Sequence, residues 1–595
     1  MKEKEFKERL EKAKREESRL AELDGRYINY RLLVFLAGIL AAGLLLYNKQ
    51  QGFAVGAAIG FISLFIAIML RHGGIRKKLL RCRTVKGIYE DFLKRISGEW
   101  TGFSDNGAEF LKQGHPYGAD LNIFGEKSLF QLLNLSHTFQ GRTRLAQLLA
   151  RPDLNGESII KRQEAVKELS NKLDFIEELT VRGALAKKTA KDPEDLLNAI
   201  RSKEKVPAVL KSPVLLFGLP ALTILSAVFA GRGFPWLYFT LLSGIILQLA
   251  LFAWSYKAVF PHLKPVHQYK NELETYQKLL ELIEKESFQS ELLNELSGRL
   301  TGKGMPASAR VGRLAAISDF IDFKYSPLIY FILNAFLLWD MQLYRLLLHW
   351  KKENAGLVGL WLDALGEFEA LAGLSVMGMI SPVSSYPVLA PGKPEFSAKS
   401  LSHPFIPYPE RIANDISING TGIITGSNMS GKTTLLRTVG INLVLAYAGA
   451  PVCAEYMRAG LMQVYTSMRN QDDLNQGIST FYAELLRIKQ IVDYSRQAKN
   501  MIFLIDEIFK GTNSKDRIDG AKIVLRNLNK PFAIGLISTH DYELCDLEGE
   551  DPARFSNAHF TENYANNQIH FDYKLHAGRC RTSNARFLMR MVGLD

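Results

Sequence analysis

Cysteine is scarce in this chain, and the few cysteines are scattered. The 595 residues contain 4 cysteines, with no C-x-x-C pair and no metal-ligand spacing. Disulfide frameworks and zinc sites need clustered or regularly spaced cysteines, so both are excluded as organising features. We expect a reduced, cytosolic setting for the bulk of the chain, with the cysteines acting as small buried hydrophobes.

The C-terminal third of the sequence lacks a marked net charge. Residues 396–595 hold 22 Lys and Arg against 20 Asp and Glu, although the whole chain has a net charge of +13. A nucleic-acid-binding domain usually shows a clear basic excess, and this region shows none. The basic excess lies in residues 1–395, where much of it flanks apolar segments. Orientation in a membrane explains it without a polyanion.

Two pairs of apolar segments contain no charged residue. They are Leu32–Tyr47 with Phe53–Leu70, and Pro213–Ala230 with Phe234–Trp254. Uncharged runs joined by such short turns predict two transmembrane hairpins, with pairs of buried core helices as the alternative. A third run, Leu328–Trp339, has 12 residues and is interpreted as a core helix.

The distribution of lysine and arginine predicts how these hairpins are oriented. Ten of these residues lie in 1–31, seven lie in 71–86, and each hairpin tip has one. Positive charge stays on the cytoplasmic side, so both tips face outward. The sequence therefore predicts a multi-pass cell-membrane protein with four spanning helices, whose N-terminus and C-terminal domain are cytoplasmic.

The rest of the chain reads as helices followed by an α/β region. Leu129–Leu149 and Leu273–Leu300 have the apolar spacing of amphipathic helices. The predicted domains are a charged N-terminal helix (1–30), the first hairpin (31–72), a connector (73–115), two helical parts (116–212 and 255–395) around the second hairpin (213–254), and an α/β domain (396–595).

Within the α/β region, several strands can be predicted. Asn419-Gly420 between Asp415–Ile418 and the next apolar run predicts a hairpin turn. Met501–Ile505 and Phe532–Ser538 predict buried strands. Polar and apolar residues alternate in His559–Tyr564 and Gln568–Leu575, which predicts a hairpin at the sheet edge.

The strongest motif is G-x-x-x-x-G-K-T, placed between an apolar strand and a helix. Its glycines allow a tight turn whose N–H groups face the phosphates of a nucleotide, while Lys432 adds a full positive charge and the Thr433 hydroxyl can ligate Mg²⁺. The candidate nucleotide-binding residues are Gly426, Ser427, Asn428, Met429, Ser430, Gly431, Lys432, Thr433 and Thr434.

Polar residues follow two further strands. Asp506 and Glu507 come after Met501–Ile505, and His540 follows Leu536–Thr539. In a phosphate-loop ATPase, Asp506 would hold Mg²⁺ through its shell, and Glu507 would polarise the attacking water. His540 would lie beside the γ-phosphate, although a lone histidine is more often structural.

A polar loop at 471–478 leads into a helix that carries Glu484. Ser479 and Thr480 stand at the N-terminus of this helix, where they would form an ordinary N-cap. The same geometry, offered by a second subunit, would bind a γ-phosphate across a dimer. The motif leaves both readings open.

Taken together, these motifs resemble the ATPase domain of the MutS mismatch-repair family. Segments between Ser128 and Val166 resemble the start of that family's helical core and lever. The segments that carry the resemblance to the ATPase domain are His403-Pro404, Ala413–Ile416, Thr425–Thr434, Asp472–Phe481, Leu504–Ile508, Gly511–Ser514, Ser538–Leu544, Phe571–Leu575 and Val592–Leu594.

The resemblance implies a helical MutS core and lever and a C-terminal P-loop ATPase domain of the ABC type. Together with the transmembrane helical hairpins predicted from the apolar runs, this gives a multidomain α + α/β fold. The resemblance implies ATP and Mg²⁺ as cofactors, with Thr433 and Asp506 as metal ligands and Asn414 near the adenine. It also implies a homodimer in which Ser479 and Thr480 complete the partner's site. The implied catalytic residues are Glu507, Asp506, Lys432 and His540.

The sequence also departs from the family. Nothing between Met1 and His115 resembles the mismatch-reading domain, no connector domain is recognisable, and the chain stops at Asp595 without the family's C-terminal dimerisation helices. ATP hydrolysis therefore transfers better than mismatch reading. One hypothesis is an ATPase that binds mismatched, branched or junction DNA. The others are a mechanochemical membrane ATPase that acts on a membrane partner without DNA, and an idle ATP-binding scaffold.

Overall fold

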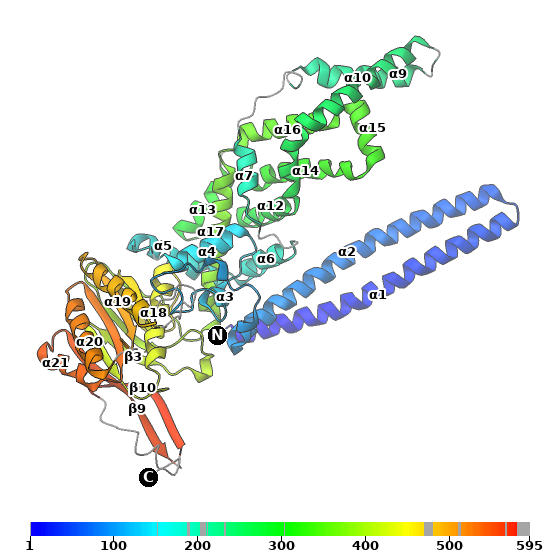
Figure 1. The fold of residues 1–595 in the computed structure, drawn as a ribbon. Helices are drawn as coiled ribbons and strands as arrows, with labels where there is room; N and C mark the ends of the chain where they lie inside the picture. Colours follow the sequence, from blue (N-terminus) through cyan, green and yellow to red (C-terminus); the bar gives the residue numbers. More distant parts are fainter. Residues whose placement is uncertain are drawn as a thin grey trace. The chain divides into compact units, whose positions relative to one another are not determined.

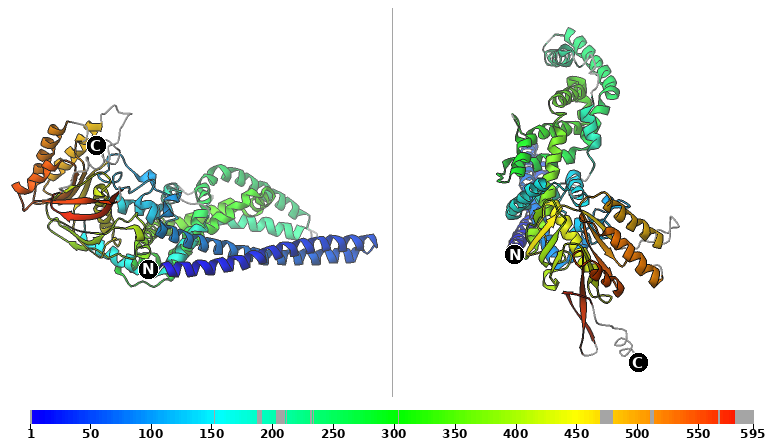
Figure 2. Two further views of the ribbon diagram at one scale, coloured as in Figure 1. Left: turned by 90° about the horizontal axis from the view of Figure 1, so that it is seen from below. Right: turned by 90° about the vertical axis from the view of Figure 1, so that its left-hand side faces the viewer.

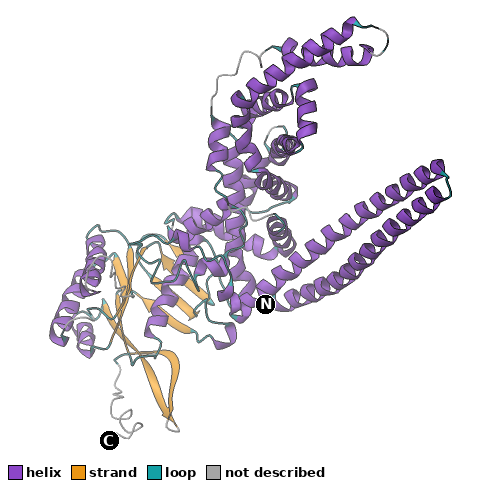
Figure 3. Cartoon of the chain, turned by 45° about the vertical axis from the view of Figure 1, so that its right-hand side comes forward, coloured by secondary structure: helices purple, strands orange, loops and turns teal. Residues whose placement is uncertain are grey.

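The chain divides into two compact units, and the strands of the described residues all lie in the first of them (Figure 3). The first unit comprises Met1–Asn134, Leu145–Leu173 and Leu371–Asp595, and the second comprises Leu135–Arg144 and Asp174–Ala370. The computed structural model describes residues 2–151, 153–186, 191–202, 210, 212–230, 232, 234–302, 304–468, 480–509, 513–565 and 568–579.

Two long helices, α1 (Glu3–Tyr47) and α2 (Gln51–Ser97), begin the first unit and lie antiparallel, side by side (Figures 1 and 2). The charged segment and the first apolar segment therefore belong to one continuous helix. Between the charged halves, Glu17 receives hydrogen bonds from Arg83 and Lys86. Between Arg31 and His72, most of the large apolar side chains of both helices are exposed.

Three described helices are long and apolar enough to cross a membrane: α1, α2 and α10 (Trp236–Ala258). The helix preceding α10, α9 (Leu219–Ala230), belongs to a shorter apolar stretch, Val214–Ala230. The apolar segments predicted from the sequence are thus helical, and the first pair is joined by a short turn at 48–50. By length and composition, these helices are candidate membrane spans.

The α/β region contains two sheets. In the six-stranded sheet, β4 is parallel to β8 and β9, β7 is parallel to β6 and β8, and β10 pairs antiparallel with β9 at the edge. Its strands, in spatial order, are β10 (Gln568–Ala577), β9 (Phe555–Ala565), β4 (Thr421–Thr425), β8 (Ala533–Thr539), β7 (Met501–Asp506) and β6 (Gln463–Ser467). The four-stranded sheet has the order β1 (Val388–Ala390), β5 (Tyr456–Gly460), β2 (Phe396–Leu401) and β3 (Asn414–Ile418).

Helices cover both faces of the six-stranded sheet. Successive side chains of a strand point to opposite faces. Phe503 and Ile505 of β7 lie in a buried cluster that includes residues of α19 (Thr480–Ser495) and α20 (Ser514–Leu528). Leu504 points the other way, toward Gly440 of α18 (Lys432–Ala448). The central strands β7 and β8 are therefore buried on both sides, which explains why they read as continuous apolar runs.

The sequence predictions for the strands were confirmed in three cases, and one was wrong. The strands at Met501–Ile505 and Phe532–Ser538 and the edge hairpin are present as β7, β8 and β9–β10. The hairpin at Asn419-Gly420 is absent, because β3 pairs with β2 whereas β4 pairs with β8 and β9. Gly420 marks a crossing between sheets, where a Cβ would lie only 2.1 Å from the carbonyl oxygen of Arg554.

Helical residues of the first unit pack against the α/β region. Arg162 of α5 (Gly156–Asn171) donates to the carbonyl oxygens of Tyr447 and Ala448, at 3.1 and 3.2 Å. These carbonyls belong to the last turn of α18, where backbone acceptors lack partners within the helix. The helix that starts at the glycine-rich loop is therefore capped at its other end by α5.

The second unit is helical. Its described helices are the first part of α4 (Phe139–Ala150), α6 (Leu173–Ala184), α7 (Glu194–Arg201), η3 (Val214–Gly218), α9, α10, α11 (Phe260–Gln268), α12 (Lys270–Lys285), α13 (Glu291–Thr301), α14 (Ala307–Ile321), η4 (Asp322–Tyr325), α15 (Pro327–Leu337), α16 (Trp339–Asn354) and the first part of α17 (Val358–Ile380).

Both of the long amphipathic helices that were predicted from the sequence are interrupted in the structure. Leu129–Leu149 forms α3 (Leu129–Leu133) and α4 (Phe139–Ala150). Leu273–Leu300 is split between α12 and α13, because the chain turns to bury Phe288 against Phe175 and Phe368. The apolar spacing continues across both breaks because all four shorter helices bury leucines, so this spacing alone does not show where a helix ends.

Helix α15 corrects the core-helix interpretation of Leu328–Trp339. Its buried residues are only Asn334 and Ala335, whereas Leu328 is 73% exposed and Phe331 is 50% exposed. The apolar side chains of this run lie on the side of α15 that faces away from the rest of the protein. Composition alone does not distinguish such a helix from a core helix.

A buried carboxylate fixes the start of α4. Glu369 of α17 accepts hydrogen bonds from the His137 backbone N–H, at 2.9 Å, and from the Thr138 hydroxyl. Gly141 makes room for it, since a Cβ there would meet its Oε2 at 2.2 Å. Burial raises the pKa of Glu369 to about 7, against 4.5 for an ordinary glutamate.

This raised pKa predicts a pH-dependent stability. The native protein binds the proton more tightly than the unfolded chain does, so the free energy of unfolding should fall as pH rises from about 4.5 to 7. The loss attributable to Glu369 is expected to reach roughly 3 kcal/mol at pH 8. Thermal unfolding midpoints of the wild type and of Glu369→Gln, compared from pH 5 to 8, measure it. Equal pH slopes in the two proteins would contradict the assignment.

Candidate functional site

The glycine-rich loop joins β4 to α18 at the carboxyl edge of the six-stranded sheet. Gly426 and Gly431 have φ angles of 149° and 109°, which favour glycine. A Cβ on Gly426 would also lie 2.9 Å from the Ser430 Oγ and 3.1 Å from the carbonyl oxygen of Phe560. The loop therefore needs both glycines, and it ends where the N–H groups of a new helix become available to an anion.

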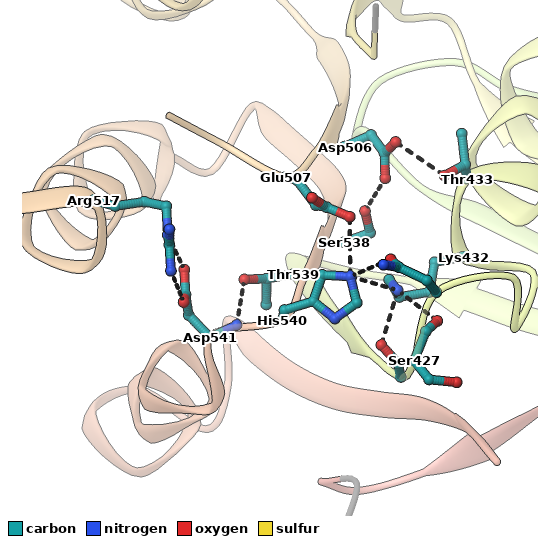
Figure 4. Close-up of polar contacts among 12 residues, drawn as sticks. Ser427, Lys432, Thr433, Asp506, Glu507, Arg517, Ser538, Thr539, His540 and Asp541 are labelled. Carbon is teal, nitrogen blue, oxygen red and sulfur yellow. Dashed lines mark hydrogen bonds and ion pairs between the residues drawn. The ribbon is translucent and has the colours of Figure 1, made fainter. Parts of the chain in front are cut away.

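The side chain of Lys432 lies inside this loop and is only 5% exposed. Its Nζ donates to the carbonyl oxygens of Gly426 at 2.8 Å and Ser427 at 2.9 Å, and it lies 3.3 Å from the His540 Nε2 (Figure 4). A full positive charge is thereby fixed at the point where the first turn of α18 adds partial positive charge. This arrangement favours a negatively charged ligand.

Asp506 lies at the end of β7, between two hydroxyl groups. The Thr433 hydroxyl donates to its Oδ2 at 2.9 Å, and the Ser538 hydroxyl of β8 donates to its Oδ1 (Figure 4). Because β7 and β8 are adjacent and parallel, Asp506 and Ser538 are direct neighbours in register. The predicted metal ligands Thr433 and Asp506 are thus brought together.

The oxygen atoms of Thr433 and Asp506 suit Mg²⁺ better than a softer metal ion. Within the described ranges, no group of three or more His, Cys, Asp or Glu is arranged to hold a metal ion. Mg²⁺ commonly binds through one or two carboxylates together with substrate phosphates and water, so Thr433 and Asp506 fit such an ion if a phosphate is present. The Ser430 Oγ is buried and has no hydrogen-bond partner among the described residues, so it could donate to the same phosphate.

Glu507 and His540 face each other beside the loop. The Glu507 Oε1 lies 3.1 Å from the His540 Nε2, which is also 2.8 Å from the Asn428 Oδ1. Glu507 has a φ of 55°, and its backbone N–H donates to the carbonyl oxygen of Ser538 at 3.0 Å. The carboxylate is therefore held off the strand axis and aimed at the space between the loop and His540.

The turn that carries His540 is fastened by an ion pair. Arg517 of α20 donates two hydrogen bonds to Asp541, at 2.8 and 2.6 Å, and the Asp541 N–H donates to the Thr539 Oγ1 at 2.9 Å (Figure 4). The paired carboxylate raises the pKa of Arg517. The pairing of Arg517 with Asp541 was not predicted from the sequence. The one signal for it was the position of Asp541 directly after His540, where an acidic residue can help to orient the histidine.

We expect Arg517→Ala to lower the turnover of a phosphate substrate about tenfold while its binding changes little, because a bidentate pair that orients His540 is lost. The matched control is Arg526→Ala on the same helix, which removes a comparable pair with Glu550 away from the site. Steady-state kcat and KM measure both. If the two variants reduce kcat equally, Arg517 has only a structural role.

The β9–β10 hairpin closes the other side of the loop. The Ser427 hydroxyl donates to the Glu562 carboxylate of β9, and a Cβ on Gly431 would lie 3.3 Å from the Tyr573 ring of β10. Tyr573 has a φ of 52° at an irregularity in the β9–β10 pairing. Neither Glu562 nor Tyr573 was singled out as a site residue from the sequence, since nothing in the hairpin pattern showed that it reaches the loop.

Asn414 uses its side chain to hold this hairpin. Its Nδ2 donates to the carbonyl oxygen of Tyr573 at 3.0 Å, and its Oδ1 accepts from the Leu575 N–H at 2.8 Å. Asn414 therefore positions the strand that carries Tyr573 beside the loop. Its predicted place near an adenine stays a prediction.

Ser479 and the side chain of Thr480, both predicted to belong to the site, lie outside the described part of the chain. Residues 469–479, including Ser479, lie outside the described part of the chain, as does 510–512. Helix α19 begins at Thr480. Inside this helix, Glu484 accepts from the Phe509 N–H at 2.5 Å and so holds the segment after Glu507.

Two stretches of the chain match the models of known domain families. Residues 422–594 match the family model of MutS domain V, and residues 117–323 match that of MutS domain III. Three similar curated proteins are each named DNA mismatch repair protein MutS. They come from Carboxydothermus hydrogenoformans (32% identical over 188 residues, 31% of this chain and 22% of the relative), Halothermothrix orenii (32% over 176 residues, 29% and 19%) and Symbiobacterium thermophilum (33% over 200 residues, 32% and 22%). The chain thus spans about a fifth of the length of these relatives.

Proposed function

Because this chain belongs to the MutS family, we propose that it is a membrane-anchored ATPase that binds and hydrolyses ATP with Mg²⁺. The observation that carries the proposal is the convergence of Lys432, the Thr433–Asp506 pair and the Glu507–His540 pair at one edge of the six-stranded sheet. These groups come from the loop after β4 and from the ends of β7 and β8.

Each part of the site has a role in this proposal. The loop 426–434 holds the phosphates through backbone N–H groups, and Lys432 neutralises their charge. Mg²⁺, held by Thr433 and Asp506, would supply charge stabilisation at the phosphates. Glu507 orients and polarises the attacking water, while His540 contacts the phosphate region. The Asn428 oxygen and the Glu507 carboxylate fix the orientation of the His540 ring.

We also propose that the active form is a homodimer. The Ser479–Thr480 segment at the start of α19 would then reach the nucleotide of the partner subunit, as in the composite site expected for the family. The support is that α19 begins at Thr480, and that the N-terminus of a helix is a place where anions are stabilised. An N-cap confined to one subunit is the alternative.

Membrane anchoring is supported by the exposed apolar surfaces of two helix pairs. The ends of α1 and α2 near their connecting turn expose Leu40, Tyr47 and Phe53, and α9 and α10 expose further large apolar side chains. Such surfaces are unfavourable in water and favourable in a bilayer. In the proposed topology, four helices span the cell membrane and the ATPase part is cytoplasmic.

For the ligand, DNA is the first candidate, and mismatched, branched or junction DNA is the kind expected from the family. A membrane partner without DNA is the second candidate, supported by the near-neutral charge of residues 396–595 and by the insertion of α9–α10 within the segment that matches domain III. In that case, ATP-driven changes would move the hairpin or a protein bound to it.

The proposal is tested by ATP turnover of the detergent-solubilised protein, alone and with duplex, mismatched and junction DNA at low salt. We expect Mg²⁺-dependent hydrolysis, and stimulation by one of these DNAs if DNA is the ligand. Hydrolysis that no DNA alters would favour the membrane-partner candidate. The absence of hydrolysis under all conditions would refute the ATPase proposal.

A further inference from the structure

Helices α9 and α10 have an inverted distribution of side chains. Large apolar residues point outward, whereas small and polar residues are buried between the helices. A helix pair in water shows the opposite arrangement, while pairs in lipid bury small and polar groups against each other. The buried residues are Pro220, Thr223, Ser226, Ala230, Gly244, Gln248 and Ser255.

The polar groups in this region are paired with one another. The Ser226 and Thr240 hydroxyls are 2.9 Å apart, and the Gln248 amide contacts the Thr223 Oγ1 at 2.7 Å. When the Gln248 amide is oriented so that its oxygen accepts from the Thr223 hydroxyl, its nitrogen donates to the carbonyl oxygen of Ala335 in α15, at 3.2 Å. Helix α15 is therefore tied to α10 through a buried polar contact.

Helix α15 repeats the inverted pattern. Leu328, Ile329, Phe331 and Ile332 are exposed, and the buried residues are Asn334 and Ala335. At its C-terminal turn, the Asn334 Nδ2 donates to the Tyr330 carbonyl oxygen at 3.1 Å, and the Asp340 N–H donates to the Asn334 Oδ1 at 3.2 Å. The Tyr330 hydroxyl donates to Asp340. Internal pairing of this kind is what a hydrocarbon environment requires of a chain reversal.

The length and flanks of α15 suit a segment that enters the membrane partway. It has 11 residues, or about 16 Å of helix, roughly half the thickness of the hydrocarbon layer. It is bent by 114° from the preceding helical segment, Ala307–Tyr325. Phe320, Phe323 and Tyr325 precede it, and the Lys324 Nζ lies 3.3 Å from the centre of the Phe260 ring. Aromatic and basic side chains are typical of the membrane–water boundary.

We propose that α15 is a re-entrant half-span that inserts beside α9 and α10, with Leu328, Ile329, Phe331 and Ile332 against lipid acyl chains. This inference rests on the membrane anchoring of α9–α10 proposed above. It adds a third lipid-facing element to the second unit, and it places the bilayer next to the helix that follows, α16, which contacts both α10 and α15.

The inference can be tested with single cysteines carrying an environment-sensitive fluorophore in proteoliposomes. The background is full-length protein with Cys82→Ser and Cys580→Ser; the remaining Cys453 and Cys545 are buried. The reporters are Leu328→Cys in α15, Ile246→Cys in α10 as the membrane reference, and Ile523→Cys in α20 as an equally apolar, exposed control. Ile332→Cys, one turn after Leu328, replaces Leu328→Cys if that variant does not fold.

We expect spin-labelled lipids to quench the fluorophores at 328 and 246 at least twofold and to leave the one at 523 unchanged. If the fluorophore at position 246 is quenched but the one at 328 is not, the inference is overturned. Reaction of the unlabelled cysteine at 328 with a membrane-impermeant maleimide would then place α15 in water. Protection of that cysteine would instead place a protein, such as a second copy of this chain, on this face of α15. If neither 246 nor 328 is quenched, the anchoring of α9–α10 itself fails.

Discussion

Replacing Glu507 by glutamine is expected to stop ATP turnover while ATP binding persists. The substitution preserves the size of the side chain but removes the carboxylate that lies 3.1 Å from the His540 Nε2. Loss of a group that polarises the attacking water typically costs about 10²–10⁴-fold in rate. The measurements are steady-state kcat and the Kd for ATP with Mg²⁺. We expect kcat to fall at least about 100-fold and Kd to stay within a few fold of the wild type.

A matched control for this experiment is Glu550→Gln. Glu550 is an exposed carboxylate that pairs with Arg526 away from the loop, so its loss should leave kcat unchanged. Wild-type turnover by Glu507→Gln would remove Glu507 from the proposed chemistry. A parallel loss of kcat in both variants would indicate a general effect of charge or stability.

Replacing Lys432 by alanine should have the complementary effect and abolish productive ATP binding. The ammonium group is buried in the loop and bonded to the Gly426 and Ser427 carbonyls. Removing the charge takes away a charged hydrogen bond to the phosphates and transition-state stabilisation, together on the order of 10³-fold in kcat/KM. Direct ATP binding and kcat/KM measure the effect.

The control for Lys432 is Lys489→Ala, an exposed lysine of α19. Lys432→Arg is a second informative variant, because a planar guanidinium does not fit the place of a compact ammonium and should restore little activity. Together with Glu507→Gln, these variants separate binding from hydrolysis. Retention of wild-type ATP affinity by Lys432→Ala would contradict a phosphate-binding role for the loop.

Much of the candidate site could be predicted from the sequence because its parts are local motifs. The loop 426–434 carries its fixed residues within nine positions, and the strand before Asp506 is an unbroken apolar run. A parallel sheet buried on both faces requires such runs, and polar residues at their ends must gather at one edge. This is why Thr433, Asp506 and His540 converge as these patterns indicate.

Other contacts depend on pairings between distant segments. Ser538 reaches Asp506 across 32 residues because β8 lies beside β7, and Arg517 reaches Asp541 across 24. The Asn419-Gly420 pair has the composition of a hairpin turn, yet it connects strands of two different sheets. Local turn propensity does not reveal which strand a segment will pair with.

The sequence by itself determined the glycine-rich loop, the strand ends that carry the acids and the histidine, and the apolar helices, because each follows from residue types within a short window. Only the tertiary structure decided that β9–β10 closes the loop through Glu562 and Tyr573, that Arg517 fastens the His540 turn, and that α15 turns its apolar side outward. The physical reason is that composition fixes how apolar a segment is, whereas the neighbours brought by folding fix which side of it is covered.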